Sequence, residues 1–191
     1  MSEIDPKIIP ITRQADLARM AKIASGDRLA MKSIFEEFSG PLNSFVRNWL
    51  ANPHDGADVV SEVMIEVWKN AARYEGRSAL KSWIFAIARN KSIDQNRKGS
   101  RLNYTDQVPE TEDLTPDAFN HIANGQNAAV LKTAMATLSL PHRRAIHLAY
   151  FEDMTYAQIA EIEACPVGTV KTRVLHAKKH LMREVVKLGR N

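Results

Sequence analysis

An all-α protein with two small helical domains joined by a flexible linker is the fold that this sequence predicts. Apolar residues recur at the three- and four-residue spacings of helices, and we find no sustained alternation of apolar and polar residues typical of strands. A polar, acidic stretch with few apolar residues interrupts the helical pattern in the middle of the chain. We therefore expect helical domains at residues 12–98 and 127–188, with the linker at residues 99–126.

The composition excludes several classes of protein. Of the 191 residues, 45% are hydrophobic and 25% are charged, as is ordinary for a globular chain. No apolar run approaches the roughly 20 residues of a membrane span, and the polar N-terminus does not resemble a signal peptide, so we expect a cytoplasmic protein. The one cysteine, Cys165, excludes an internal disulfide and a thiolate zinc cluster. We interpret it as a small buried residue in a turn rather than as a redox sensor.

Charge is unevenly distributed along the chain. Residues 1–98 carry 15 lysines and arginines and 12 acidic residues, residues 99–126 carry one and five, and residues 127–191 carry ten and five. Basic segments favour polyanions because lysines and arginines release the counterions condensed on phosphates. The two outer blocks are therefore expected to favour nucleic acid, which would repel the acidic connector.

Three helical segments are expected at the start of the first domain. The first, residues 12–25, ends at Gly26, which suits the C′ position after a helix. Asp27 can cap the second, which Gly40-Pro41 should break, and Asn52-Pro53 should stop the third. The expected inward residues are Leu17, Met20, Ala21 and Ala24, then Ile34, Phe35 and Phe38, then Leu42, Phe45, Val46, Trp49 and Leu50.

Two longer helices complete the first domain. Asp55 or Asp58 should open a helix whose apolar residues form a wide buried stripe. After a break at residues 75–77, Ser78 can cap a last helix over residues 79–98. The expected inward residues are Val59, Val60, Val63, Met64, Val67 and Trp68 in the first helix, and Leu80, Trp83, Ile84, Ile87 and Ile93 in the second.

The second domain contains the spacing of a helix-turn-helix. Helical periodicity returns at Ala129 and starts again at Pro141, a residue suited to the beginning of a helix. Thr155 can cap the next short helix, and a turn over residues 164–166 leads to another helix from Val167. Two helices joined by such a turn can cross at the angle that lays the second one in the major groove of DNA.

The helix from Val167 has an apolar side and a basic side. Its apolar side should face the domain and comprises Val167, Val170, Val174, Ala177 and Leu181. Its basic side should face DNA, with Thr172 and His176 as base contacts, Lys171 and Arg173 on bases or phosphates, and Thr169 and Lys179 on the backbone. A solvated basic helix is the plainer alternative. His176 and His180 are four residues apart, but no carboxylate stands between them, so we expect no metal.

Two long stretches resemble one known family, the bacterial sigma factors of the extracytoplasmic-function group. Region two of that group resembles the stretch Tyr74-Glu-Gly-Arg-Ser-Ala-Leu-Lys-Ser-Trp-Ile-Phe-Ala-Ile-Ala-Arg-Asn-Lys-Ser-Ile-Asp-Gln-Asn-Arg-Lys. Region four resembles Thr155-Tyr-Ala-Gln-Ile-Ala-Glu-Ile and Cys165-Pro-Val-Gly-Thr-Val-Lys-Thr-Arg. The resemblance covers nearly the whole chain and implies a protein that binds core RNA polymerase, directs it to promoters and helps to open the duplex. It implies no catalysis and no cofactor.

The resemblance also implies two contacts with promoter DNA. The helix from Val167 would read the upstream element, while the loop at residues 74–81 and Asn90 would read the downstream element. A basic surface with amide and hydroxyl groups could hold an extruded base and the adjoining single strand. This surface comprises Arg77, Ser78, Lys81, Arg89, Asn90, Arg97 and Lys98. Trp83 fits the apolar stripe and is assigned to the core, whereas Phe85 is left open between the core and a base stack.

Protein partners follow from the same resemblance. The helix at residues 58–71 matches the part of the family that docks on the clamp coiled coil of the largest polymerase subunit, and Asp58, Glu62 and Glu66 form an acidic line on it. Acids near a helix N-terminus also favour the helix dipole, which accounts for Asp58 better than for Glu66. The acidic linker would thread polymerase channels with basic walls. We further expect a monomer when free and an anti-sigma factor that holds the protein inactive until a stress signal.

Two other functions stay open at this point. An ordinary helix-turn-helix regulator would bind DNA tightly on its own, usually as a dimer on paired half-sites, whereas a sigma factor becomes specific only with polymerase. An enzyme has little support, because the sequence holds no glycine-rich phosphate loop, no nucleophile motif and no grouped set of histidine, cysteine and carboxylate.

Overall fold

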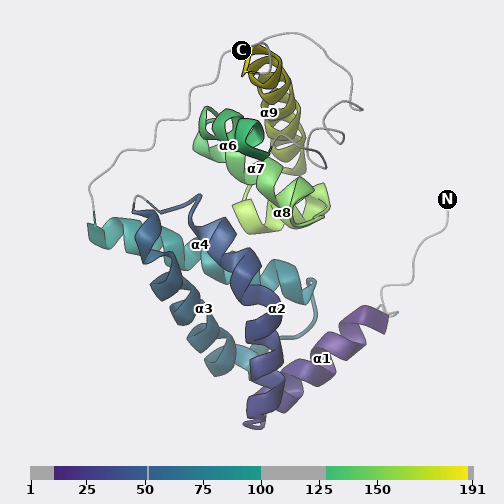
Figure 1. Cartoon of the computed structure of the whole chain (residues 1–191). Coiled ribbons are helices and arrows are strands. Elements are labelled where there is room, and N and C mark those ends of the chain that lie inside the picture. The colour runs from purple at the N-terminus through teal and green to yellow at the C-terminus, as the bar shows by residue number, and fades with distance from the viewer. Residues whose placement is uncertain (1–10, 51, 100–127, 189–191) are drawn as a thin grey trace, which may run out of the picture. The chain divides into compact units, whose positions relative to one another are not determined.

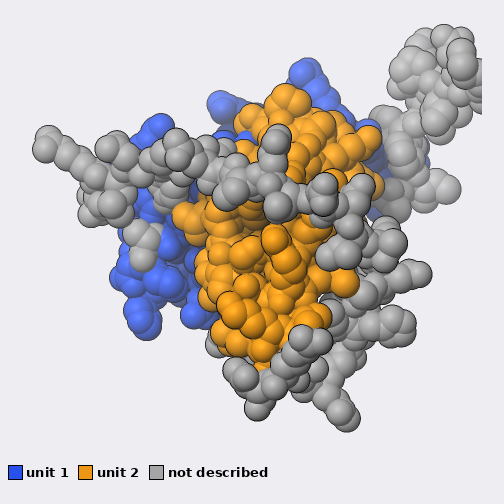
Figure 2. All heavy atoms as spheres, turned by 90° about the horizontal axis from the view of Figure 1, so that it is seen from above, with its two compact units in different colours: residues 1–100, 161–163 blue, residues 101–160, 164–191 orange. Residues whose placement is uncertain are grey.

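The regular elements of the described residues are all helical, which confirms the predicted class. The computed structural model describes residues 11–50, 52–99 and 128–188 (Figure 1). Two compact units form, one from residues 1–100 with 161–163 and one from residues 101–160 with 164–191 (Figure 2). The predicted linker at 99–126 lies outside the described residues apart from its first residue. Within the described ranges, no helix combines the length and apolar character that crossing a membrane requires.

In its described residues, the first unit has four α-helices and two short 3₁₀ turns. They are α1 (Ile11–Ala24), α2 (Arg28–Val46), η1 (Pro53–Asp55), α3 (Gly56–Asn70), η2 (Ala71–Arg73) and α4 (Leu80–Gly99). Helix α3 lies against both α2 and α4, and α1 packs on α2 and η2. Phe45 of α2 and Phe85 of α4 are fully buried, with ring centroids 5.1 Å apart, and form the centre of the core.

Helix α2 continues through Gly40-Pro41, where the sequence predicts a break, so that prediction is wrong. Pro41 lacks the N–H that would donate to the Glu37 carbonyl, a loss that costs roughly 3 kcal/mol inside a helix. Burial on both sides of the proline offsets this cost, at about 1.5–3 kcal/mol for each large side chain. The buried residues of this one helix are Ile34, Phe38, Leu42, Phe45 and Val46.

The turn between α1 and α2 has the caps that the sequence predicts. Gly26 has a φ of +92°, and the Asp27 N–H donates to the Lys22 carbonyl at 3.0 Å, as in a glycine-terminated helix. The Asp27 carboxylate then accepts from the N–H groups of Leu29 and Ala30 at 2.9 and 3.1 Å. These bonds satisfy donors that the first turn of α2 leaves without backbone partners.

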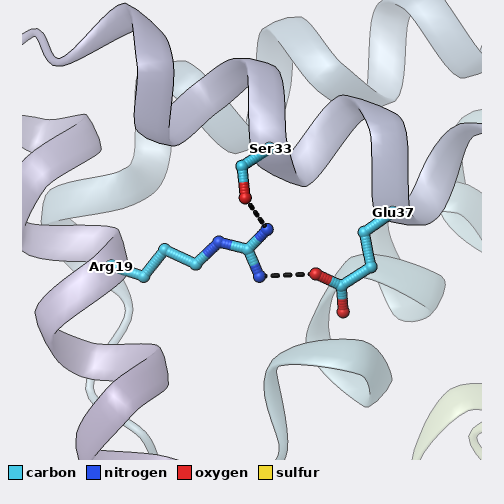
Figure 3. A network of polar contacts seen from close by, with 3 residues as sticks. All are labelled: Arg19, Ser33 and Glu37. Carbon is cyan, nitrogen blue, oxygen red and sulfur yellow. Dashed lines mark hydrogen bonds and ion pairs between the residues drawn. The ribbon is translucent and has the colours of Figure 1, made fainter.

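A polar cluster of Arg19, Ser33 and Glu37 links α1 to α2 (Figure 3). The Arg19 guanidinium donates to Glu37 Oε2 at 2.6 Å and to the Ser33 hydroxyl. Because the Glu37 side chain is 52% exposed, water screens the ion pair and limits its contribution to about 0–1 kcal/mol. The burial of Met20 and Ile23 therefore does more than this cluster to hold α1 in place.

The buried face of α4 differs from the predicted one. Ile87 and Ile93, predicted to point inward, are only half-buried. Phe85 takes the central position instead, because its ring packs on Phe45 of α2. The buried residues of α4 are Leu80, Ser82, Ile84, Phe85, Ala88 and Ser92. In the other helices of the first unit, the predicted inward residues that prove exposed are Ala21, Ala24, Phe35 and Trp68.

In its described residues, the second unit has three whole α-helices and the first five residues of a fourth, α8. They are α6 (Ala128–Ala136), α7 (Leu140–Tyr150), α8 (Tyr156–Glu163) and α9 (Val167–Leu188). Helix α9 packs along α6 and α7. The predicted inward side of α9 is buried at Val170, Val174, Ala177 and Leu181, but Val167, as the first residue of the helix, is 40% exposed.

Arg143 of α7 closes the end of α6. Its guanidinium donates to the carbonyls of Met135, Ala136 and Leu138 at distances of 2.8–3.0 Å. Carbonyls at the end of a helix have no backbone partners within it, and a cation there also favours the helix dipole. The Arg143 side chain therefore ends α6 and also joins it to α7. These are the two helices on which α9 packs.

Candidate functional sites

A loop between η2 and α4 lines a pocket of about 240 Å³. The lining comes from residues 73–78 and from the Trp83 side chain of α4. Gly76, in the middle of the loop, has a φ of +67°. A Cβ at this position would lie 3.2 Å from the Leu17 side chain of α1. Both the backbone conformation and the packing against α1 therefore favour glycine here.

Tyr74 fixes this loop from the inside. Its buried ring lies 5.4 Å from the Trp83 ring, measured between centroids. Its hydroxyl donates to the Ser78 carbonyl at 2.9 Å and so closes the loop. Burial and, to a smaller extent, the Asp16 carboxylate raise the pKa of Tyr74 to about 12. The phenol therefore keeps its proton at neutral pH and remains a hydrogen-bond donor.

Arg77 and Glu75 place opposite charges along the same pocket. Arg77 Nη2 and Glu75 Oε2 are 2.6 Å apart, yet the two side chains are 87% and 60% exposed. Exposed pairs of this kind contribute about 0–1 kcal/mol, so a ligand can separate them at little cost. The pocket thus offers N–H donors and a carboxylate acceptor beside the aromatic rings of Tyr74 and Trp83. This combination suits the polar edge and the flat face of a nucleobase.

The residues predicted to meet single-stranded DNA do not all lie at the pocket. Arg77 and Ser78 line it. Asn90 and Arg97 are exposed farther along α4, where Arg97 forms an ion pair within its own helix, with N and O atoms 3.7 Å apart. The Lys98 side chain lies outside the described residues. The predicted set therefore divides into a pocket group and a group along the helix.

The other two cations of the predicted set, Lys81 and Arg89, each lie over an aromatic ring. The Lys81 ammonium lies 5.8 Å from the centre of the Phe85 ring, and the Arg89 guanidinium lies 5.4 Å from that of Trp49. Both side chains are half-buried. Phe85 is fully buried, which assigns it to the core and not to a base stack. Trp83, assigned to the core on its sequence pattern, is the aromatic residue of α4 that reaches the pocket.

The outer side of α3 combines two acidic and two apolar residues. Asp58 and Glu62 are exposed, while Ile65 and Trp68 are 53% and 38% exposed. On a helical wheel all four fall within an arc of about 120°, and we refer to them together as the α3 face. The apolar pattern predicts Trp68 in the buried stripe and does not single out Ile65. The helical spacing of Asp58, Glu62 and Ile65 is the signal that reveals this mixed surface.

Glu66, the third acid of the predicted docking line, is bonded within the first unit. Its Oε2 lies 3.2 Å from Lys91 Nζ of α4, and its Oε1 accepts from Asn70 Nδ2 at 2.7 Å. The hydrogen bond and the charge of Lys91 lower the pKa of Glu66 below its ordinary value. Glu66 therefore ties α3 to α4, and its part in docking stays a prediction beside this structural role.

The second candidate site is the helix-turn-helix of α8 and α9. Thr155 caps α8 as predicted: its N–H donates to Gln158 Oε1 at 2.8 Å, and the Gln158 N–H donates to Thr155 Oγ1 at 3.3 Å. Ala164 then ends α8 with a φ of +51°, and the Cys165 N–H donates to the Ala160 carbonyl at 3.1 Å. This is a Schellman ending in which alanine occupies the position that glycine usually takes.

The predicted DNA-facing residues of α9 differ in their exposure. Lys171 and Thr172 are exposed, Thr169, Arg173 and His176 are half-buried, and Lys179 is buried at 8% exposure. Burial disfavours the predicted contact of Lys179 with the DNA backbone. Leu175, an apolar residue outside the predicted set, is 42% exposed. The open surface of α9 therefore centres on Lys171, Thr172 and Leu175.

The two histidines of α9 contact different neighbours. His176 stacks on His142 of α7, with ring centroids 6.2 Å apart and an interplanar angle of 22°. His180 Nε2 lies 2.8 Å from Thr137 Oγ1. In the part of the chain that the structure describes, no group of three or more histidine, cysteine, aspartate or glutamate residues is placed to hold a metal ion.

Two family models match the chain. The model described as Sigma-70 region 2 matches residues 34–102, and the one described as Sigma-70, region 4 matches residues 128–181. The first span contains the pocket and the α3 face. The second contains α8 and α9 as far as Leu181.

Similar proteins agree with these matches. The chain is 29% identical over 178 residues to the ECF RNA polymerase sigma factor SigL of Mycobacterium tuberculosis, covering 91% of this chain and 98% of that protein. It is 30% identical over 166 residues to the ECF RNA polymerase sigma factor RpoE of Cereibacter sphaeroides, covering 83% and 88%. A solved structure of the sigma factor RpoE in complex with the anti-sigma factor NepR, from Bartonella quintana, matches with a TM-score of 0.62 and 26% identity, covering 82% of this chain and 96% of that one.

Proposed function

We propose how this chain, which belongs to the extracytoplasmic-function family of RNA polymerase sigma factors and is an alternative sigma factor, recognises its promoters. It binds core RNA polymerase through α3 and reads promoter DNA at two sites. The pocket at residues 73–78 takes one unstacked base of the downstream element. The outer side of α9 enters the major groove at the upstream element. The polymerase supplies the catalysis.

The pocket is the observation that carries this proposal. Its Trp83 ring, backed by the buried Tyr74 ring, supports a flat ring, and the exposed pair of Glu75 and Arg77 offers an acceptor and donors to the edge of that ring. A carboxylate accepts from the exocyclic amino groups of cytosine, adenine and guanine, whereas thymine has no amino group. The pocket therefore favours an amino-bearing base over thymine.

The exposed residues of α4 extend this site along the strand. Asn90 and Arg97 offer amide and guanidinium donors to the backbone and bases of single-stranded DNA. Lys81 and Arg89 lie over aromatic rings and add positive charge at fixed positions. Single-stranded DNA is then held by charge along α4 and identified by one base in the pocket.

The upstream element is read by the open surface of α9. Lys171 and Thr172 reach base edges or phosphates, and the exposed Leu175 side chain provides an apolar contact of the kind that a thymine methyl group makes. His176 adds a contact from the α7 side of the helix. Phosphate contacts set the position of α9 in the groove, and base contacts supply the sequence preference.

The α3 face is the docking surface for polymerase. Its exposed Ile65 and Trp68 supply apolar area, and Asp58 and Glu62 select a basic partner. Exchange of Ile65 and Trp68 for alanine should weaken binding to core polymerase. Leu29→Ala, at a residue of α2 that is 78% exposed, is the matched control and should bind normally. Equal binding by both variants would remove the α3 face from the proposal.

An anti-sigma factor is a further proposed partner, because the similar Bartonella quintana sigma factor is seen with one. Co-purification of the tagged protein from cells, with and without stress, should return a second small protein in the unstressed sample. Recovery of polymerase alone under both conditions would contradict this partner and leave the sigma function intact.

Run-off transcription tests the function itself. Core polymerase is incubated with genomic fragments, with and without the full-length protein, and new promoter-specific transcripts are expected only in its presence. The absence of any new transcript would overturn the proposal. Tight binding of the free protein to DNA as a dimer would favour the helix-turn-helix regulator instead.

Two substitutions separate the DNA sites. Asn90→Ala should change the preference at the downstream element and leave polymerase binding intact. His176→Ala should change the preference at the upstream element by roughly 1–3 kcal/mol if it contacts a base. If Asn90→Ala lowered transcription equally from every promoter sequence, Asn90 would be structural.

A further inference from the structure

The contact between His142 and His176 joins a buried residue of α7 to the proposed DNA side of α9. The two imidazole rings are nearly parallel, with an interplanar angle of 22° and centroids 6.2 Å apart. His142 is only 8% exposed, whereas His176 is half-buried. The His142 ring therefore lies beside the His176 ring, nearly parallel to it, on the inner side of α9.

A hydrogen bond at the start of α7 holds His142 in turn. Its Nδ1 lies 3.0 Å from Ser139 Oγ. Ser139 occupies the N-cap position of α7, but its hydroxyl makes no capping bond to the helix backbone. The serine that would ordinarily cap the helix is used to orient an imidazole ring instead.

A second histidine anchors α9 one turn farther along. The Thr137 hydroxyl donates to the Ala134 carbonyl at 2.7 Å. It therefore accepts from His180 Nε2 at 2.8 Å. His176 thus meets the first turn of α7, and His180 meets Thr137 in the segment between α6 and α7. The side of α9 that carries the two histidines therefore has a defined position.

We propose that His142 is a positioning residue, which holds the His176 imidazole in the orientation that reads the upstream element. This inference rests on the proposed function. A free histidine side chain samples several rotamers and loses that freedom when it contacts DNA. Stacking on His142 restricts the ring before DNA arrives, so less entropy is lost on binding.

Two replacements of similar size separate this role from simple packing. His142→Phe keeps a flat ring against His176, whereas His142→Leu keeps apolar volume without a flat ring. Both lose the bond to Ser139. If His142 only fills space, the two variants should behave alike. If it orients His176, only the leucine variant should lose sequence preference.

The measurement uses run-off transcription by the polymerase holoenzyme. Templates carry a promoter that the wild-type protein recognises, with single base pairs of its upstream element exchanged, and the ratio of transcript from original to exchanged template is recorded. His142→Leu should lower this ratio on the order of tenfold at the base pair where His176→Ala lowers it. His142→Phe should keep most of the ratio. The double variant His142→Leu, His176→Ala should match His176→Ala alone, because both changes remove one contact.

Exchanges in the downstream element serve as the internal control and should give wild-type ratios with every variant. The inference is overturned if His142→Leu lowers all transcripts by one factor, or if it leaves the upstream ratio unchanged while His176→Ala alters it. A wild-type protein that yields no transcript overturns the proposed function, and the inference with it. These results are distinguishable, because only the last concerns the wild-type protein.

Discussion

The pocket of the first unit and the open surface of α9 are both proposed to bind DNA, but they are built in different ways. The pocket needs Leu17 from α1, the loop at residues 73–78 and Trp83 from α4. The surface of α9 comes from a single helix, in which position along the chain sets direction in space. Loss of a contact that supports the pocket should therefore change the shape of the pocket. Loss of a contact that supports α9 should instead loosen or move the helix, while the arrangement of residues on its surface stays the same.

The largest expected effect tests the support of α9. Arg143→Met removes three hydrogen bonds from a charged donor to the end of α6 and should destabilise the second unit by about 3 kcal/mol. All three tryptophans, Trp49, Trp68 and Trp83, lie in the first unit. Urea unfolding followed by circular dichroism should shift, while the tryptophan fluorescence curve should not.

Arg183→Met is the matched control for this experiment, because Arg183 is an exposed arginine of the same unit. It should leave both unfolding curves unchanged. If the fluorescence curve also shifted with Arg143→Met, the two units would unfold together. The two DNA sites would then not be stabilised separately.

Gly76→Ala tests the support of the pocket. The added Cβ would lie 3.2 Å from Leu17 in a backbone conformation that disfavours side chains, at a cost of roughly 2 kcal/mol. Tryptophan fluorescence should report this loss, and base preference at the downstream element should weaken. Addition of Leu17→Ala relieves the contact but not the backbone strain, so a full recovery would show that packing alone requires the glycine.

A pH titration tests how Tyr74 supports the pocket. Its pKa is about 12 in the folded protein against an ordinary value of 10, so the folded state keeps a proton that the unfolded chain releases. The contribution of this group to stability is therefore complete below pH 10 and falls as the pH rises towards 12. Tyr74→Phe should lose about 1 kcal/mol at neutral pH and show a smaller decline above pH 10. An unchanged decline would mean that other groups cause it.

The smallest expected effect concerns the turn before α9. Ala164 has a φ of +51°, a conformation that costs an L-residue about 1–2 kcal/mol and glycine very little. Ala164→Gly should therefore stabilise the second unit by about 0.5–1 kcal/mol, after the greater entropy of glycine in the unfolded chain is subtracted. Circular dichroism melting should record the gain, with unchanged upstream preference. A loss of stability would indicate that the methyl group packs in the turn.

Local rules predict several helix ends, because each cap depends on a few neighbouring residues. They fail at Asn52-Pro53, since α2 already ends at Val46, and Asp55 precedes α3 without a side-chain capping bond. Gly26, Asp27 and Thr155 make the bonds expected of them. The prediction of a break at Gly40-Pro41 is wrong because packing against distant residues, and not the local sequence, decides the outcome there. Its local cost is outweighed by the burial of side chains against α3 and α4, which lie elsewhere in the sequence.

The direction in which side chains point likewise depends on local spacing in one helix and on tertiary packing in another. The predicted apolar residues of α9 are all buried from Val170 onward, because one clear apolar stripe favours one way to pack. Lys179, predicted on the opposite side, is buried as well. Helix α4 is apolar on more than one side, so the wheel does not choose between Trp83 and Phe85. Contact with Phe45 of α2 makes that choice and leaves Trp83 for the pocket.

Patterns in the sequence predict the helical class, the two family regions, the caps at Gly26, Asp27 and Thr155, and the apolar side of α9 from Val170 onward. All of these depend on spacing along the chain or on residues within one turn of each other. The continuity of α2, the shape of the pocket, the internal bond of Glu66 and the stacking of His176 on His142 depend on how the helices pack. Each of these joins residues far apart in sequence, and the free energy that selects them comes from burial and contacts that exist only after the helices have packed.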